Sequence, residues 1–451
     1  MNNLFLSAIM MASPMMVKAA NPMDALKNHN DKMFKKDIIK VTDDVYVAVG
    51  FSEATSSMII GEDGIIIIDT TQGSGTAEDI LTEFRKITDK PIKAIVYTHG
   101  HLDHICGAEV FVAEGSNPEI YARDNLFNEL DDKHLNSNST GPFQILQKRL
   151  VRQYGVGVLT PYTEKISNGI GPADLNIEGW GKGFVPPTRT FGGDKMELTA
   201  AGIKLELYKA PGETDDQLFV WIPEKKVLFS GDNFYQTFPN LYAIRGTVYR
   251  DFNLWANSLD LMTQFPVVHL VPGHTRPISG TKAKEALSDY RDAIRYIISK
   301  TAEGMNKGLT PDELVEYVKL PEHLASKYYL QEFLGTVVWS VRAYFSGTIG
   351  WFDGNPSNLF PTPPVERAQR IAELAGGEAA LYAKLQEAAE SREHQWVSEL
   401  ADTVVLLGTH KREAQALKAQ ALVALADQQS SAIARNYYLA YAKELKAELE
   451  A

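Results

Sequence analysis

Short apolar runs alternate with amphipathic stretches through the first half of the chain. The runs at residues 45–49, 58–60, 65–68 and 94–97 predict strands, because each is short and is followed by polar or turn-forming residues. Residues 77–86 have the spacing of an amphipathic helix between two of these strands. Strand and helix therefore take turns, which is typical of an α/β domain whose helices cover a sheet.

From about residue 286 the strand pattern gives way to helical periodicity. The sequence Thr-Pro-Asp-Glu at 310–313 is a capping box with proline at the first helical position. Further helices are predicted to start near Glu378, His394, Lys411 and Ser431. Glu378 and Lys411 are about one tetratricopeptide period apart, but two helix pairs are too few for a binding array. Residues 286–451 are therefore predicted to form an all-α domain, with a peptide-binding groove as the alternative.

Residues 125–195 interrupt the regular alternation. This stretch is rich in glycine, asparagine, proline and threonine, and so long a segment without its own elements is uncommon in a compact core. It predicts a long excursion of the chain over the functional site. A plain surface insertion is the alternative.

The densest chemistry of the chain is the run Thr-His-Gly-His-Leu-Asp-His at 98–104, directly after the predicted strand 94–97. Open sheets commonly place their chemistry at the carboxyl ends of strands. The alternate positions of His99 and His101 point both rings the same way, whereas Asp103 and His104 can reach a second position. The spacing predicts two adjacent metal ions. A surface metal scavenger, or a set of hydrogen-bonded loop residues, is the alternative.

Three more potential ligands lie in turns at the ends of apolar runs. Glu213 follows the run 205–208, Asp232 follows 227–229, and His274 follows 267–271. The combined nitrogen and oxygen donors suit zinc better than calcium or magnesium, and two metals recur among hydrolases. The candidate ligands are His99, His101, Asp103, His104, Glu213, Asp232 and His274.

The HxHxDH loop, the Gly-Asp turn and the Pro-Gly-His-Thr turn resemble the metallo-beta-lactamase superfamily over roughly residues 38–285. The resemblance implies a four-layer αββα sandwich, two sheets face to face with helices outside. The strand ending at Asp69 is similar to the first motif of the superfamily, whose aspartate supports the metal loop from behind. Glu213 stands where most members place a third imidazole, and a glutamate there resembles the alkylsulfatases.

A narrower resemblance is to the bacterial alkylsulfatases that degrade dodecyl sulfate. Asn240, Arg245 and Arg250 are similar to their sulfate-contacting loop, and residues 183–188 resemble another of their loops. Residues 350–356 are similar to the segment that opens their dimerisation region. The resemblance thus implies that residues 286–451 form an all-α dimerisation domain and that the protein is a homodimer.

Some features depart from these relatives. They tend to have glutamate where Asp232 stands, and an asparagine where this chain reads Ala-Thr-Ser-Ser at 54–57. They also carry a further C-terminal module, similar to sterol-carrier proteins, that lines the groove for the alkyl chain. The chain is expected to lack this module, so that it acts on shorter or different sulfate esters or receives the module from a separate polypeptide. Chain-length preference, the bond that breaks and the metal loaded in the cell are left open.

The leading hypothesis is a zinc-dependent hydrolase that cleaves sulfate esters, in particular alkyl sulfates, with a metal-activated water. Asn240, Arg245 and Arg250 would orient the sulfate, because guanidinium groups match tetrahedral oxyanions; surface ion pairs are the alternative for the arginines. Other hypotheses are a lactonase, thioesterase or beta-lactamase of the same fold, and a non-catalytic metal-binding dimer. Two zinc ions per chain are expected, one held by His99, His101 and Glu213 and the other by Asp103, His104 and His274. Asp232 is expected to bridge the two ions or to lie close to the bridging position. The candidate catalytic carboxylates are Asp103 and Asp232.

The amino-acid composition limits the classes of molecule that the protein can bind. The 451 residues, 44% of them hydrophobic, are enough for two cores of ordinary size. A formal net charge of −12 argues against nucleic acid as a partner. The expected partner is the small anionic sulfate ester that the alkylsulfatase resemblance implies. The lone cysteine, Cys106, excludes an internal disulfide. It is expected to pack as a small hydrophobic residue, with a metal ligand or reactive thiol as the alternative.

Residues 1–20 resemble a secretory signal peptide with a small-residue cleavage site at Lys-Ala-Ala, 18–20. Lysine and arginine are missing from its first part, and the apolar stretch is too short and interrupted for a stable membrane span. The expected mature protein is periplasmic or secreted. A misassigned start codon or a disordered tail is the alternative.

Overall fold

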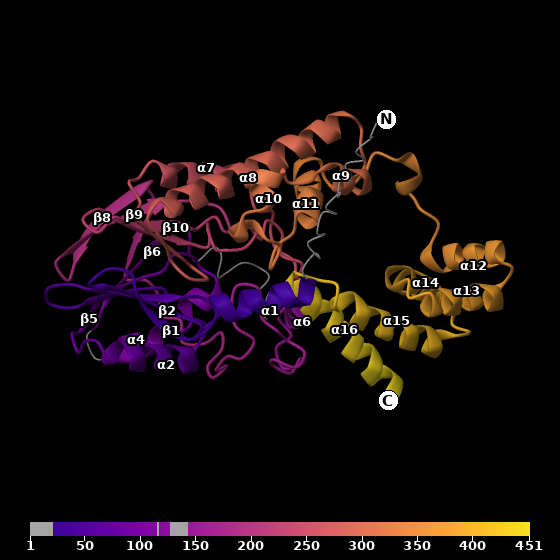
Figure 1. The fold of residues 1–451 in the computed structure, drawn as a ribbon, viewed down its shortest axis with the longest axis horizontal. Helices are drawn as coiled ribbons and strands as arrows, with labels where there is room; N and C mark the ends of the chain where they lie inside the picture. Colours follow the sequence, from indigo (N-terminus) through magenta and orange to yellow (C-terminus); the bar gives the residue numbers. More distant parts are fainter. Residues whose placement is uncertain (1–20, 115–116, 127–142) are drawn as a thin grey trace, which may run out of the picture.

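A computed structural model describes residues 21–114, 117–126 and 143–451. Two β-sheets face each other and are covered on their outer sides by helices, and a helical region extends away from them (Figure 1). This is the predicted αββα sandwich followed by an all-α region, so the predicted fold class is confirmed. The predicted signal peptide at 1–20 lies outside the described residues. None of the helices in the described part of the chain is long and apolar enough to cross a membrane.

The first sheet has seven strands in the described residues, antiparallel from β1 to β4 and parallel from β4 to β7. These strands are β1 (Asp37–Lys40), β2 (Val45–Val49), β3 (Ser56–Ile60), β4 (Ile65–Ile68), β5 (Ile92–Val96), β6 (Glu119–Arg123) and β7 (Arg189–Phe191).

The second sheet has six strands in the same described ranges, in the order β13-β12-β11-β10-β9-β8. Its pairs are antiparallel apart from β11 and β12, which run parallel. Its strands are β8 (Lys195–Ala200), β9 (Ile203–Lys209), β10 (Leu218–Ile222), β11 (Val227–Gly231), β12 (His269–Pro272) and β13 (Ile278–Ser279).

The alternation of side chains along β4 shows why the sheets stack in this way. Ile66 and Ile68 face the second sheet and pack with Leu205 and Val220, whereas Ile65 and Ile67 face the outer helices. All four isoleucines are nearly inaccessible to solvent. A strand that is apolar on both faces is typical of a sheet covered on both sides.

The outer layers are helical. α2 to α4 cover the first sheet, while α7 and α8 pack on the second and α11 packs against α8 and α9. The helices of the described residues are α1 (Pro22–Met33), α2 (Ser74–Arg85), α3 (Leu102–Ile105), α4 (Ala108–Ala113), α6 (Phe143–Tyr154), α7 (Phe252–Thr263), α8 (Thr281–Asn306), α9 (Pro311–Tyr317), α10 (Glu322–Ala325), α11 (Val337–Ile349), α12 (Pro364–Ala375), α13 (Glu378–Glu390), α14 (His394–Leu407), α15 (Lys411–Ala426) and α16 (Ala432–Glu450), with the 3-10 turns η1 (Tyr328–Leu330) and η2 (Pro356–Asn358).

Most predicted elements lie where the sequence placed them. The runs 45–49 and 65–68 are β2 and β4, and the capping box at the start of α9 has both of its hydrogen bonds. Segment 125–195 is less irregular than expected, because it contains α6 and the edge strand β7, which the sequence analysis did not predict. The predicted domain boundary at 285/286 falls inside α8, whose Ala283, Leu287 and Ile294 belong to one continuous core.

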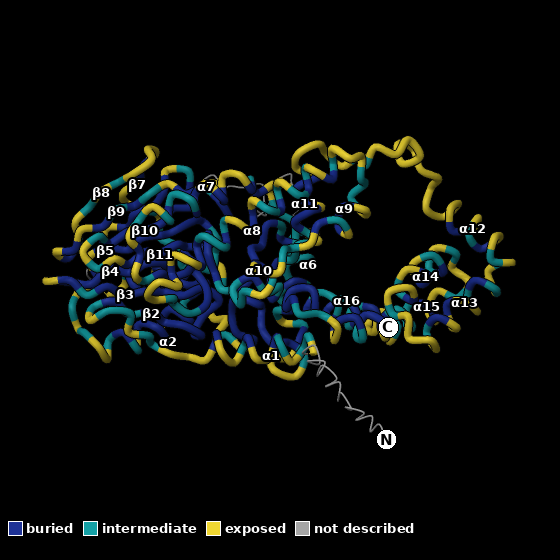
Figure 2. Tube along the Cα trace, turned by 45° about the horizontal axis from the view of Figure 1, so that its top comes forward, coloured by how far each residue is buried: buried dark blue, intermediate teal, exposed yellow. Residues whose placement is uncertain are grey.

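The last helices leave the sandwich and then return to it. α12 to α15 stand away from the sheets, and the segment that leads to them from α11 is exposed (Figure 2). α16 comes back to pack along α6. Its first residue, Ala432, lies in a small apolar cluster with Leu26 of α1 and Phe333. The helical region is therefore attached to the sandwich at both of its ends.

Candidate metal centre

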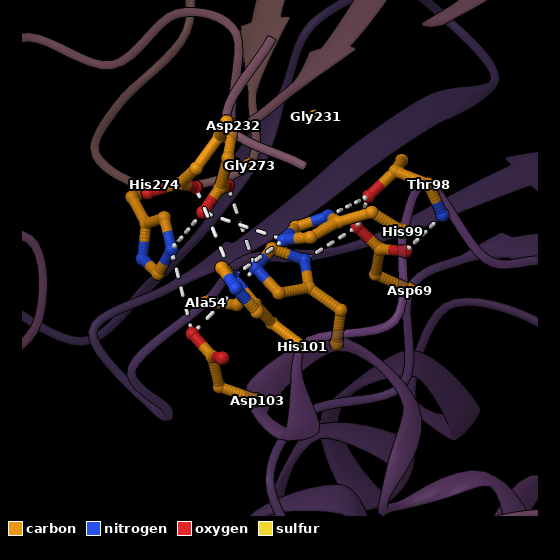
Figure 3. A network of polar contacts seen from close by, with 12 residues as sticks. Ala54, Asp69, Thr98, His99, His101, Asp103, Gly231, Asp232, Gly273 and His274 are labelled. Atoms are coloured by element: carbon orange, nitrogen blue, oxygen red, sulfur yellow. Dashed lines mark hydrogen bonds and ion pairs between the residues drawn. The ribbon is translucent and has the colours of Figure 1, made fainter. Parts of the chain in front are cut away.

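The strand registers bring the predicted ligand turns to one edge of the sandwich. In the first sheet Ile68 pairs with Val96 in parallel, so the residues after β4 and β5 emerge side by side. In the second sheet Phe229 pairs with Val271, also in parallel, so the turns after β11 and β12 emerge together. Asp69, the HxHxDH loop, Asp232 and His274 thereby come from four strand ends that meet (Figure 3).

All seven predicted ligands converge into two adjacent clusters. In each cluster the candidate ligand atoms lie within 4.8 Å of one another. Asp232 lies between the clusters: its Oδ2 is 3.8 Å from His99 Nε2 and 3.0 Å from His274 Nε2, and its Oδ1 is 3.4 Å from His104 Nε2. The first cluster contains His99, His101, Glu213 and Asp232, and the second contains Asp103, His104 and His274.

In three of the histidine ligands, the Nδ1 atom points away from the metal clusters and makes a hydrogen bond to an acceptor. His104 Nδ1 donates to Asp69 Oδ2 at 2.8 Å, and His274 Nδ1 donates to the Glu53 carbonyl at 2.8 Å. The Thr98 hydroxyl donates to Asp69 and accepts from His99 Nδ1 at 3.0 Å. These acceptors fix the ring tautomers and leave each Nε2 lone pair facing inward. The predicted supporting role of Asp69 has this geometry.

Several inward atoms are buried without a hydrogen-bond partner. Glu213 Oε2 is one of them, and His104 Nε2 and Asp232 Oδ1 face each other at 3.4 Å as an ion pair without a hydrogen bond, although such groups are costly. Burial raises the pKa of Glu213, and the carboxylates around Asp232 outweigh burial at His104 and His274 and raise the pKa of both rings above the usual range. Burial lowers the pKa of His99 and His101 well below the usual range, so these two imidazoles are neutral. A neutral imidazole is the form that binds metal, and the orphaned atoms are what a metal ion would satisfy. The clusters are therefore able to bind metal.

The predicted sulfate-contacting residues line the cavity beside these clusters. Arg250 is 4% exposed, and its Nη1 donates to Glu213 Oε1 at 2.5 Å and to the Asn240 carbonyl at 2.6 Å. A surface ion pair is therefore wrong for Arg250, which holds a candidate metal ligand in place. Arg245 donates to the Gly246 carbonyl and faces the cavity, and the Asn240 Oδ1 is buried without a partner.

The cavity has a volume of about 150 Å³ and an apolar wall that the sequence analysis missed. Leu150, Tyr154, Ile170 and Trp180 line it and all come from the segment 125–195. This supports the predicted excursion over the site rather than a plain surface insertion. Glu53 also lines the cavity, and burial raises its pKa to about 7. None of these residues carries a local motif. Only the glycine-rich and proline-rich composition of the excursion pointed to its four wall residues, and nothing in the sequence pointed to Glu53.

Cys106 lies outside both metal clusters. Its side chain is fully buried in the core between the first sheet and its outer helices. Burial raises the pKa of its thiol to about 12. Of the two sequence interpretations, the structure favours packing as a small hydrophobic residue.

Comparisons with known proteins agree with this geometry. Residues 49–274 match the metallo-beta-lactamase superfamily, and residues 310–448 match the alkyl sulfatase dimerisation family. The αββα sandwich with two metal-binding clusters at its edge defines a metallo-beta-lactamase-type protein.

Similar individual proteins identify the family within this superfamily. A linear primary-alkylsulfatase of Pseudomonas sp. is 40% identical over 400 residues, which cover 87% of this chain and 74% of that protein. An alkyl/aryl-sulfatase of Saccharomyces cerevisiae is 28% identical over 419 residues, which cover 91% of this chain and 64% of that protein. The solved structure of a stereoselective inverting sec-alkylsulfatase from Pseudomonas sp. aligns with a TM-score of 0.82 at 27% identity, covering 94% of this chain and 70% of that one. The chain belongs to the alkylsulfatase family of the metallo-beta-lactamase superfamily.

Proposed function

We propose that this protein is a dinuclear zinc alkylsulfatase, which hydrolyses alkyl sulfate esters to an alcohol and inorganic sulfate. The observation that carries the proposal is the convergence of seven nitrogen and oxygen ligands on two adjacent positions beside a cavity that also holds Arg245 and Asn240. The mixed donors favour zinc. The names of the relatives, which include primary, secondary and alkyl/aryl sulfatases, leave the preferred alkyl group open.

Two zinc ions, when bound, supply an activated water and positive charge against the sulfate oxygens. His99, His101 and Glu213 would hold one ion, and Asp103, His104 and His274 the other, with Asp232 shared between them. The side chain of Asp103 is 25% exposed and lines the cavity. In this proposal the Asp103 carboxylate accepts the proton of the attacking water.

The cavity is lined by polar and by apolar side chains, and each kind suits one part of an alkyl sulfate. Arg245 and Asn240 face the position next to the metal ligands and would orient the anionic sulfate. Leu150, Ile170 and Trp180 supply apolar surface for the alkyl group. Arg250 acts indirectly in this proposal, since its donation to Glu213 fixes the direction of that ligand.

Sulfate release from a graded series of alkyl sulfates, with dodecyl sulfate among them, tests the proposal. The zinc-loaded protein is expected to release sulfate, and His101→Ala is expected to abolish release, because His101 is a ligand of the first cluster. Hydrolysis of a lactone, thioester or lactam in place of sulfate esters would favour another hydrolase of this fold. Fewer than one zinc per chain in metal-replete protein would contradict the dinuclear mechanism.

We also propose that the protein is a homodimer and that it is exported. The homodimer is supported by the match of residues 310–448 to the alkyl sulfatase dimerisation family. Export is supported by the sequence of residues 1–20. Cell fractionation with sequencing of the mature amino terminus tests the second proposal: the expected terminus follows Ala20, and a cytoplasmic protein that retains Met1 would contradict it.

A further inference from the structure

Asn436 lies in α16, the last helix of the dimerisation region, yet it is fully buried against the catalytic sandwich. Its Nδ2 donates to the Ser167 carbonyl at 3.2 Å and lies 3.5 Å from Asn168 Oδ1. A buried amide of this kind is costly unless it is hydrogen-bonded. The proposed mechanism gives it no role.

The loop of residues 167–172 that Asn436 contacts is part of the cavity wall. Asn168 N donates to the Gly171 carbonyl at 2.9 Å, which closes a tight turn with Ile170 at its tip. Ile170 lines the cavity beside the metal ligands. Gly169 has φ +84°, and a Cβ there would lie 2.3 Å from the Phe333 carbonyl oxygen, so only glycine fits. α16 therefore lies directly behind a rigid part of the substrate cavity.

Hydrogen bonds continue from this loop to a metal ligand. The Asn168 amide donates to the Glu53 carboxylate, and the Glu53 carbonyl accepts from His274 Nδ1 at 2.8 Å. The path from Asn436 to His274 thus runs through the backbone of Ser167 and Asn168, the Asn168–Glu53 hydrogen bond and the covalent chain of Glu53 itself. The side chains of Asn436, Asn168, Glu53 and His274 are all buried.

Apolar packing runs parallel to this series. Ile433, one turn before Asn436, packs with Ile170 and Tyr235. The Tyr235 ring meets the His274 ring edge to face, with centroids 6.0 Å apart. The first turns of α16 therefore touch the surroundings of His274 by two independent routes.

We infer that Asn436 is a positioning residue for the metal centre, so that docking of α16 on the sandwich sets the geometry of the Asp103, His104 and His274 cluster. The predicted effect of Asn436 on catalysis rests on the proposed function, whereas the predicted effect on metal binding does not. Through Asn436, a helix of the dimerisation region becomes part of the support of the active site.

The test compares Asn436→Asp and Asn436→Ala with Arg435→Gln in the full-length protein. Aspartate keeps the shape of asparagine but turns an acceptor toward the Ser167 carbonyl, and alanine removes the donor with less disturbance. Arg435 is the adjacent residue of α16 and pairs with Asp427, away from the cavity, so its variant controls for damage to the helix itself.

Two readouts are needed, cobalt(II) titration followed by its visible absorption spectrum, and kcat and KM for dodecyl sulfate. Outer partners of metal ligands typically change affinity about 10- to 100-fold, and Asn436 acts at one more remove. We therefore expect both Asn436 variants to weaken binding of the cobalt ion that the Asp103, His104 and His274 cluster would hold by about threefold to tenfold, and to lower kcat more than they raise KM. Asn168→Asp should produce the same change, and its combination with Asn436→Ala should be less than additive.

A lower melting temperature with cobalt affinity and kcat equal to those of Arg435→Gln would overturn the inference, since Asn436 would then serve folding alone. If one Asn436 variant does not fold, the other and Asn168→Asp decide in the same way. An unmutated protein that binds two cobalt ions but releases no sulfate would contradict the proposed function, while the cobalt titration would still decide the role of Asn436.

Discussion

Asp69 sets the orientation of two candidate metal-ligand rings. Its Oδ1 accepts from Thr98 N at 2.8 Å, and its Oδ2 accepts from the Thr98 hydroxyl and from His104 Nδ1. Its backbone lies in the left-handed region, with φ +59°, where a residue other than glycine persists only when its surroundings hold it there. One carboxylate therefore orders the start of the HxHxDH loop and reaches both metal clusters through His99 and His104.

The first prediction concerns Asp69→Asn. The amide keeps the shape of the carboxylate but replaces one acceptor oxygen with a donor, which must face either Thr98 or His104 unfavourably. We expect zinc affinity, measured by competition with a chelator, to fall about 10- to 100-fold. The control is Asp79→Asn, because Asp79 is an exposed residue of α2 that makes only a 3.7 Å pair with Lys36. Equal zinc affinity in the two variants would refute the supporting role of Asp69.

The second prediction concerns Cys106. Its thiol is fully buried and its pKa is raised to about 12, so the reactive thiolate is rare near neutral pH. A disulfide reagent is expected to label Cys106 in the native protein only at the rate of the unfolding events that expose the thiol. In guanidinium chloride it is expected to label Cys106 at once. Cys106→Ala is expected to keep the zinc content of the unmutated protein. Rapid labelling of native protein, or loss of zinc in the variant, would support a reactive or ligating cysteine instead.

The candidate ligands could be predicted from the sequence because they occupy short motifs whose spacing follows from strand geometry. His99 and His101 need only alternation on an extended segment, and Asp232 and His274 need only strand-end turns. Glu53 and Tyr154 could not be predicted in this way. They reach the cavity through long-range packing of segments that have no motif of their own.

Among the helices, α1 places a buried histidine beside the apolar cluster of Leu26. His29 Nε2 donates to the Gly169 carbonyl at 2.8 Å, its Nδ1 lies 2.9 Å from the Tyr328 hydroxyl, and its ring stacks on Phe333 with centroids 4.0 Å apart. Burial lowers the pKa of His29 to about 4. The ring is therefore neutral in the folded protein above about pH 4.

The third prediction follows from that pKa. The unfolded chain binds the His29 proton below about pH 6.5 and the folded chain only below about pH 4, so stability falls as pH decreases between these values. The full loss is about 3 kcal/mol, of which about 2 kcal/mol arises between pH 7 and pH 5. Denaturant unfolding at the two pH values should show that His29→Gln lacks this part of the pH dependence. An identical pH dependence in the variant and the unmutated protein would rule out the predicted contribution.

Local periodicity identified most elements but not their assembly. β2, β4 and the starts of α13, α14 and α15 agree with the sequence prediction, because each depends on a pattern of a few consecutive turns or alternations. α6 was missed because the glycine and asparagine around it dominate the composition of that segment. α6 packs against α16, almost 300 residues away, where Arg152 pairs with Glu444, and no local pattern reports such a contact.

At the scale of the whole molecule, the segment between α11 and α12 exposes large apolar side chains. Trp351 is 74% exposed and Phe360 is 94% exposed, and both lie inside the range that matches the alkyl sulfatase dimerisation family. Figure 2 shows this segment as an exposed stretch that leaves the sandwich. Contiguous exposed apolar residues mark interaction surfaces in soluble proteins, so this segment is the expected contact with a second copy.

The last prediction is that the double variant Trp351→Ser, Phe360→Ser weakens the proposed homodimer. Large aromatic residues at the centre of an interface commonly contribute about 2 kcal/mol or more each. The loss of both, about 4 kcal/mol, should raise the dissociation constant about 1,000-fold. Sedimentation velocity over a concentration series measures this shift from dimer to monomer. Tyr162→Ser is the matched control, because Tyr162 is 65% exposed but lies outside the dimerisation range. Since both substitutions are far from the metal ligands, zinc content should stay unchanged, and a double variant that remains dimeric would place the interface elsewhere in the helical region.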